Sequence, residues 1–258
     1  MLGAIAAGAA VGPIFLPDPL AQPCVLECRN LAPSWAHPFG TDDLSRDILS
    51  RVATGGRISL AVATLAVGLS VTLGAAMGLV AGYWGGTVDA GLMRLVDAAL
   101  AIPRLFLLLL VLAVWDQVPM PVLIVLIGVT GWFGTGRLVR GEALRLREES
   151  YVRAAEALGA NRRRIIFRHL LPNTAGPLLV AATLGVGDVI LLEAGLSFLG
   201  LGVPLPTPSW GGMILDAKSL LFTAPWAGIF PGLAIVMTVL SANLFGDALR
   251  DAVDPRGA

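Results

Sequence analysis

One run restricts the fold more than any other feature of the sequence: the 24 residues from Ile58 to Ala81 contain no charged side chain. About 20 apolar residues in a helix cross the hydrocarbon core of a bilayer. Only 14% of the chain is charged and 56% is hydrophobic, whereas a soluble domain carries roughly 25% charged residues. We therefore expect a membrane protein.

Long apolar runs indicate helices, because lipid offers the backbone no hydrogen-bond partners. We predict a single all-α transmembrane domain, residues 1–258, built as a helical bundle of about six spans. Residues 1–16 would form a short or truncated first span, and residues 17–57 an outside loop before a membrane core at 58–250. The other spans are expected at Ile58–Ala81, near Pro103–Val118, and at Met120–Gly136, Pro177–Leu192 and Trp226–Phe245.

The orientation follows from the basic residues, since cytoplasmic segments carry an excess of Lys and Arg. With both termini in the cytoplasm, 13 basic residues lie inside and 5 lie outside. Nine of the inside arginines fall between Arg137 and Arg168, in a predicted cytoplasmic loop at 137–177. The reverse orientation would place the majority outside, so we expect both termini inside.

The stretch 150-SYVRAAEALGANRRRIIFRHLLPNTAG-176 is the most polar ordered segment of the loop. Ser150 is expected to cap a helix over Tyr151–Leu158, and Gly159 fits its C-terminus because glycine tolerates positive φ. Asn161 is expected to cap a second helix, which Pro172 would end.

Two interpretations of this stretch compete. A basic segment beside the membrane could bind anionic lipid through Arg162, Arg163, Arg164 and Arg168. Alternatively, a short helix–turn–helix could dock into a groove on a partner protein. Lipid binding requires the arginines, but it does not require the fixed spacing of the alanines, Gly159 and Leu171-Pro172.

The spacing resembles the EAA loop of permease subunits of bacterial ATP-binding-cassette (ABC) importers. Arg153 stands where that pattern has Glu, and His169 stands where it has Ile. Both departures suit the dipeptide/oligopeptide/nickel branch, whose version is similar to 168-RHLLPN-173. Four further blocks are similar to its C-type permease: 37-HPFGTDDLSRDILSRVATGGRISL-60, 82-GYWGGTVD-89, 193-EAGLSFLGLGVPLPTPSWGGMI-214 and 231-PGLAIVMTVLSANLFGDALRDAVDPR-256.

This resemblance implies a permease of the bacterial inner membrane that forms half of a pathway for peptides or similar small polar cargo. Its expected partners are a second permease subunit, two cytoplasmic ATPase subunits that bind ATP and Mg, and an outside solute-binding protein. The loop would couple the chain to the ATPases. The residues expected to do so are Tyr151, Arg153, Ala154, Ala155, Ala157, Leu158, Gly159, Ala160, Leu171 and Pro172.

The chain itself is expected to be no enzyme and to hold no cofactor. The only lysine lies in 212-GMILDAKS-219, which lacks the second glycine of a phosphate-binding loop and follows no predicted strand. No group of residues has convincing metal-ligand spacing. Cys24 and Cys28 could bind metal or form a disulfide, but two ordinary thiols are the favoured interpretation.

Two acidic residues are expected in or near the fifth span. Asp188 and Glu193 could line the pathway or act in gating, because ionisable groups at membrane depth are costly. The alternative is that neighbouring helices or water satisfy them. The charges from Asp42 to Arg57 are expected on the solvated face of an interfacial helix.

Two other functional classes remain at this point. An ion-coupled secondary transporter would need two related halves with broken helices and intramembrane charges, and no such repeat is visible. A membrane scaffold with a lipid-binding basic loop would explain the arginines but not the spacing around Gly159.

Overall fold

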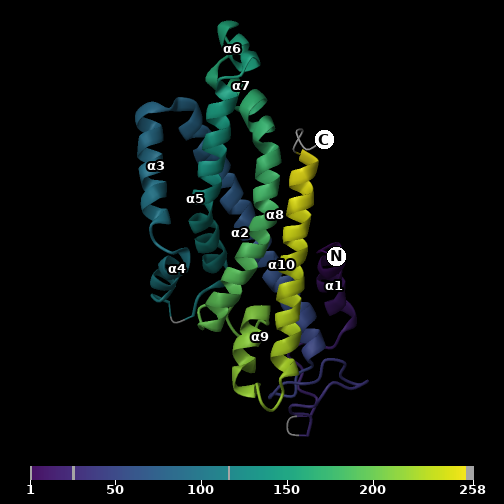
Figure 1. Ribbon diagram of the computed structural model, residues 1–258. Helices are drawn as coiled ribbons and strands as arrows, with labels where there is room; N and C mark the ends of the chain where they lie inside the picture. The colour runs from purple at the N-terminus through teal and green to yellow at the C-terminus, as the bar shows by residue number, and fades with distance from the viewer. Residues whose placement is uncertain (1, 25–26, 116, 254–258) are drawn as a thin grey trace. The chain divides into compact units, whose positions relative to one another are not determined.

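The computed structural model describes residues 2–24, 27–115 and 117–253, and every regular element in these ranges is helical (Figure 1). The helices are α1 (Leu2–Phe15), α2 (Ile48–Trp84), α3 (Gly86–Leu100), α4 (Arg104–Leu112), α5 (Met120–Arg147), α6 (Ser150–Ala157), α7 (Arg162–Ile165), α8 (Leu171–Phe198), α9 (Trp210–Ala217) and α10 (Trp226–Val253). A π-helical turn at Ile166–Leu170 joins α7 to α8, and a 3-10 turn at Lys218–Leu220 follows α9.

Four helical segments are long and apolar enough to cross a membrane: Ile48–Trp84, Met120–Arg147, Arg162–Phe198 and Trp226–Ala252. Helices α3 and α4 together would make a fifth, bent by 82° at the break between them. Helix α1 has 14 residues, or about 21 Å at 1.5 Å per residue, so it is shorter than the ~30 Å hydrocarbon core. The expected polytopic helical bundle is therefore confirmed, with four or five full spans and a short apolar helix.

The third span differs from its prediction. A helix does begin at Arg104, but α4 ends at Leu112 and is only nine residues long. The Arg104 guanidinium donates to the Ile127 carbonyl and to Thr130, part-way along α5. Arg104 is one of the 13 basic residues counted above as cytoplasmic. Instead it is the first residue of α4, and its guanidinium lies beside Ile127, ten residues before Arg137 in α5. Pro103 interrupts the helical run, since it cannot donate to the preceding turn.

Helix α2 begins at Ile48, ten residues before the expected start of its span at Ile58. The expected interfacial segment is therefore partly the first turns of the same helix. Its start is fixed by Asp47, whose side chain accepts from the Ser50 N–H at 2.9 Å, as an N-cap aspartate does.

The chain forms two compact units, and we describe each by itself. Unit 2 comprises residues 65–108, 125–185 and 244–258. In it α2 and α5 approach closely at glycines: a Cβ on Gly74 would lie 2.7 Å from the Thr135 Cβ, and one on Gly78 would lie 2.5 Å from the Gly136 carbonyl oxygen. Small residues at these two positions therefore let α2 and α5 pack closely.

Unit 1 comprises residues 1–64, 109–124 and 186–243. Its apolar core joins the start of α2 to α9 and to the start of α10. The buried members are Ile48, Met213, Ala217, Leu220, Ala224 and Ala227. Phe39 stacks on Phe230 with ring centroids 3.9 Å apart, so the segment before α2 is fastened to α10.

Candidate functional site: the α6–α7 loop and the buried polar groups

Helix α6 is a short amphipathic helix with one deeply buried residue. Val152 is 0% exposed and packs in a cluster of buried side chains from α2, α5, α7, the π-turn and α8. These are Leu79, Tyr83, Val139, Ala143, Leu146, Ile165, Leu170 and Leu178. Sequence inspection missed Val152, Ile165 and Leu170 as anchors. Their apolar type at helical spacing was the available signal.

The opposite face of α6 is exposed. Leu158, just after the helix, is 89% exposed, and Tyr151 is 41% exposed. The small side chains of Ala154 and Ala157 lie in the open, as does Arg153, which pairs with Glu148. Ala155 and Ala160 are partly buried. An exposed apolar side chain beside small residues is a surface that another protein can approach closely.

Polar contacts tie α6 to the end of α2 within unit 2. The Tyr83 hydroxyl donates to the Glu156 carboxylate at 3.4 Å. One residue of α5, Arg147, donates to the Tyr83 carbonyl at 3.1 Å. Glu156 and Tyr83 were not among the expected site residues, and neither lies at a position that the spacing pattern marks.

Gly159 ends α6 in the way its sequence position predicted. Its φ is +82°. Its N–H donates to the Glu156 carbonyl at 2.9 Å, and the Ala160 N–H donates to the Ala155 carbonyl at 3.0 Å. These two bonds make a Schellman motif, which requires the left-handed conformation at the residue after the cap. The added Cβ of another residue would meet no atom within 4 Å.

The start of each short helix only partly matches its prediction. Glu149, and not Ser150, is the N-cap of α6, and it makes no side-chain capping bond. Ser150 is instead the first helical residue. The Asn161 side chain accepts from the Arg164 N–H at 2.8 Å, so the predicted cap of the second helix is confirmed.

Pro172 does not end the second helix, which corrects the prediction. The helix runs from Arg162 to Phe198 without interruption. At the π-turn the Leu171 N–H bonds back to the Ile166 carbonyl, one residue further than in an α-helix. Pro172 directly follows this turn, where the regular α-helical bonding pattern is already interrupted, so its missing N–H is tolerated. Leu171 packs against the buried cluster and Pro172 is exposed.

Asp188 and Glu193, both on α8 in unit 1, lie in different surroundings. Asp188 is exposed. Glu193 is 1% exposed and accepts from the Ser197 hydroxyl at 2.6 Å and from the Ser59 hydroxyl of α2 at 3.4 Å. Ser59 accepts in turn from the Trp210 N–H at 3.2 Å. Glu193 is thus satisfied by one serine of its own helix and one of α2, whereas Asp188 is accessible.

The comparisons with known proteins agree on one family. The family described as "Binding-protein-dependent transport system inner membrane component" matches residues 74–257, which include α6, α7 and α8. The chain belongs to this family. It is a permease subunit of an ABC importer, as the spacing around Gly159 indicated.

Individual relatives place the permease in the peptide branch. It is 44% identical over 228 residues to the dipeptide transport system permease protein DppC of Alkalihalophilus pseudofirmus, covering 88% of this chain and 75% of that one. It is 42% identical over 224 residues to the oligopeptide transport system permease protein OppC of Bacillus subtilis, covering 87% and 73%. It is 42% identical over 227 residues to the glutathione transport system permease protein GsiD of Pectobacterium atrosepticum, covering 88% and 75%.

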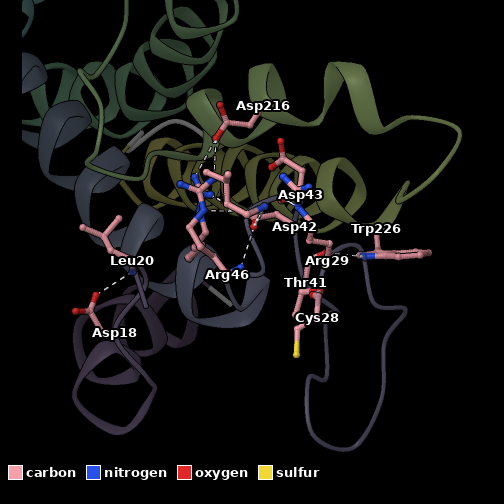
Figure 2. A network of polar contacts seen from close by, with 12 residues as sticks. Asp18, Leu20, Cys28, Arg29, Thr41, Asp42, Asp43, Arg46, Asp216 and Trp226 are labelled. Carbon is pink, nitrogen blue, oxygen red and sulfur yellow. Dashed lines mark hydrogen bonds and ion pairs between the residues drawn. The ribbon is translucent and has the colours of Figure 1, made fainter. Parts of the chain in front are cut away.

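The permease also contains a buried ionic network that the sequence did not reveal, built in unit 1 (Figure 2). The Asp42 carboxylate accepts from the Arg46 guanidinium at 2.7 Å and also pairs with Arg51. Arg51 reaches Asp216 of α9 at 3.0 Å. Asp42, Arg46 and Arg51 are all buried. The expected solvated face from Asp42 to Arg57 is therefore wrong over these three residues, because α9 covers them.

The segment preceding α2 in the permease is closed by a disulfide between Cys24 and Cys28, and not by two ordinary thiols as favoured from the sequence. The Thr41 hydroxyl donates to the Cys28 carbonyl and accepts from the Leu31 N–H at 2.8 Å. The Thr41 carbonyl accepts from the Trp226 indole at 3.3 Å. Figure 2 shows Thr41 between Cys28 and Trp226, beside the ionic network.

Proposed function

We propose that α6 and α7 are the coupling element of this permease, and that they bind separate cytoplasmic ATPase subunits. The observation that carries the proposal is the combination of an exposed tip, Leu158 with the small residues Ala154 and Ala157, and a buried root at Val152. A contact on the tip would move a rigid element and not a loose loop.

The packing supplies a route for that movement. Val152 shares its cluster with Tyr83 of α2, Val139 of α5 and Leu178 of α8, and Glu156 is bonded to Tyr83. A displacement of α6 is therefore passed to three long helices at once. Closure of an ATP-bound ATPase pair would act on the pathway through these contacts, and ATP hydrolysis would reset it.

The chemistry of ATP is proposed to belong to the partners, which would bind ATP and Mg. In this chain the near-match to a phosphate-binding loop, around Lys218, lies within α9 and the 3-10 turn that follows it. Such a loop needs an open backbone between a strand and a helix, and a helical backbone uses those N–H groups itself.

We further propose that residues 17–47 face the outside of the inner membrane and that both termini face the cytoplasm. Two independent features support this orientation. Disulfides persist in oxidising compartments outside the cytoplasm, and Cys24 is bonded to Cys28. The basic residues favour the same orientation even when Arg104 is left out of the cytoplasmic count, because twelve of them then lie inside and five lie outside.

For cargo, we propose peptides or similar small polar molecules, because the relatives are named for dipeptide, oligopeptide and glutathione transport. A second permease subunit would form the other half of the pathway, and an outside binding protein would deliver the cargo. The accessible Asp188 carboxylate is suited to face the pathway and contact a cationic group. Glu193, bonded to Ser59 and Ser197, is suited to hold α2 and α8 in register during gating.

Co-purification tests this function. The tagged chain is extracted from membranes in mild detergent beside two variants that each add one carboxylate at an exposed apolar site: Leu158→Glu, and the control Phe222→Glu, which lies before α10 and is 101% exposed. We expect the wild type and the control to retain a second permease and P-loop ATPases, and Leu158→Glu to lose most of the ATPases. Equal recovery with all three chains would refute the coupling role.

A further inference from the structure

Helix α7 and the π-turn carry four arginines, Arg162, Arg163, Arg164 and Arg168, which we call the α7 arginine cluster. All four are exposed. Among the residues that the structure describes, none of the four guanidinium groups forms an ion pair or a side-chain hydrogen bond. The cluster is therefore a concentration of positive charge that the chain leaves uncompensated.

The neighbouring charges are balanced, which makes the cluster distinctive. Arg145 pairs with Glu142 and Glu149, at 2.9 Å and 3.4 Å. Arg153 pairs with Glu148. The end of α5 and the start of α6 thus neutralise themselves, while α7, a few residues later, does not.

Local stability does not explain the cluster. The first turn of a helix is its positive end, so basic residues there are unfavourable by a few tenths of a kcal/mol each. Arg162, Arg163 and Arg164 are the first three residues of α7. Three like charges at this end of a helix therefore have no explanation in the stability of the helix itself.

The distance along the helix argues against lipid as a partner of the cluster. The continuous apolar stretch of the helix begins at Pro177, and Arg163 lies 14 residues before it, about 20 Å at 1.5 Å per residue. The headgroup layer on each side of the hydrocarbon core is only about 5–8 Å thick. The cluster therefore extends beyond the headgroups into water, beside the exposed tip of α6 (Figure 1).

We propose that the α7 arginine cluster binds an acidic surface on the cytoplasmic ATPase subunit, next to the contact made by α6. This inference rests on the proposed coupling function and adds the chemistry of the partner surface. The two parts divide the work: Leu158 and the alanines of α6 supply apolar contact, and the cluster supplies electrostatic attraction. Charges at the rim of an interface mainly set the association rate and its dependence on salt.

The test is the affinity of purified ATPase subunits for the permease complex in nanodiscs, measured from low to high salt. The variant is Arg163→Gln/Arg164→Gln/Arg168→Gln, with Arg162 kept because it acts electrostatically on Tyr83. The matched control removes three other arginines of unit 2, as Arg94→Gln/Arg137→Gln/Arg145→Gln. At low salt we expect the α7 variant to bind about ten-fold more weakly and to lose most of its salt dependence, and the control to bind like the wild type.

Two outcomes would overturn the inference. Equal salt dependence of ATPase binding in the α7 variant and the wild type would show that the cluster makes no electrostatic contact with the ATPase. The proposed coupling function would still hold if Leu158→Glu releases the ATPases. An effect of the α7 variant only in nanodiscs that contain phosphatidylglycerol, and not in pure phosphatidylcholine, would assign the cluster to anionic lipid. Failure of the proposed coupling function would give a different result: the ATPase would bind the wild type and Leu158→Glu equally.

Discussion

At the scale of the residue, Gly159 is the position where backbone conformation and proposed coupling meet. Its φ of +82° is freely available to glycine, and asparagine adopts it at lower cost than other residues that carry a Cβ. A side chain there would meet no atom of this chain. The consequence of a substitution is therefore backbone strain in the turn between α6 and α7, and not a steric clash.

This argument predicts an order of effects for substitutions at Gly159. Gly159→Asn should retain most ATPase binding, Gly159→Ala should lose part of it, and Gly159→Val should lose the most, because the cost of positive φ is about 1–2 kcal/mol for a residue with a Cβ and rises with branching. Co-purification of the ATPase with each variant gives the order.

A different order would change the interpretation of Gly159. If the loss followed side-chain volume alone, with Asn worse than Ala, the glycine would be required for close approach of the partner. The Schellman turn would then be incidental to binding.

At the scale of the element, the ionic network fixes α9 to the start of α2. Asp42 is buried between Arg46 and Arg51, so it compensates two buried cations. Removing one member of a buried ion pair costs about 3–5 kcal/mol, because the remaining charge stays desolvated.

We therefore expect Asp42→Asn to lower the thermal unfolding midpoint of the purified permease by several degrees. Asp216→Asn should lower the midpoint less, since the Asp216 side chain is partly exposed and water can take over its contact with Arg51. The neighbouring Asp43→Asn is the control, because its side chain takes part in none of the network's ion pairs among the described residues. Asp42→Asn and Asp43→Asn with the same midpoint would show that the network contributes little.

The elements also show what the sequence could predict. Gly159 and Asn161 were interpreted correctly because their roles depend on local backbone geometry, which a residue type reports directly. Pro172 was misinterpreted because the π-turn at Ile166–Leu170 leaves no sequence signal, and it lets the helix continue past the proline. The third span was expected to begin near Pro103, and α4 does begin at Arg104, but neither the early end of α4 nor its bend from α3 was predicted.

Burial was the other quantity that the sequence could not supply. The charges of Asp42, Arg46 and Arg51 were assigned to a solvated face because their pattern alternates. Asp216 of α9, 165 residues after Arg51, pairs with both arginines. Long-range contacts of this kind cannot be read from spacing. Glu193 is similar, since its partner Ser59 comes from α2.

At the scale of the whole molecule, the family assignment and the element order give a permease whose exposed helix α6 follows one long helix, α5, and precedes another, α8. The resemblance reached this family from five separated sequence blocks, and the match over residues 74–257 confirms it. The orientation and the partners are proposals that α6 makes testable, because its exposed face must lie on the ATPase side of the membrane.

The most direct test of the coupling role is site-specific photo-crosslinking in intact cells. A photoreactive phenylalanine replaces either Tyr151 on α6, 41% exposed, or Phe222 before α10, 101% exposed; both replacements keep an aromatic ring. We predict that position 151 crosslinks to a P-loop ATPase and that position 222 does not. Crosslinking of the ATPase from position 222, or of lipid alone from position 151, would contradict the assignment of α6 as the coupling element.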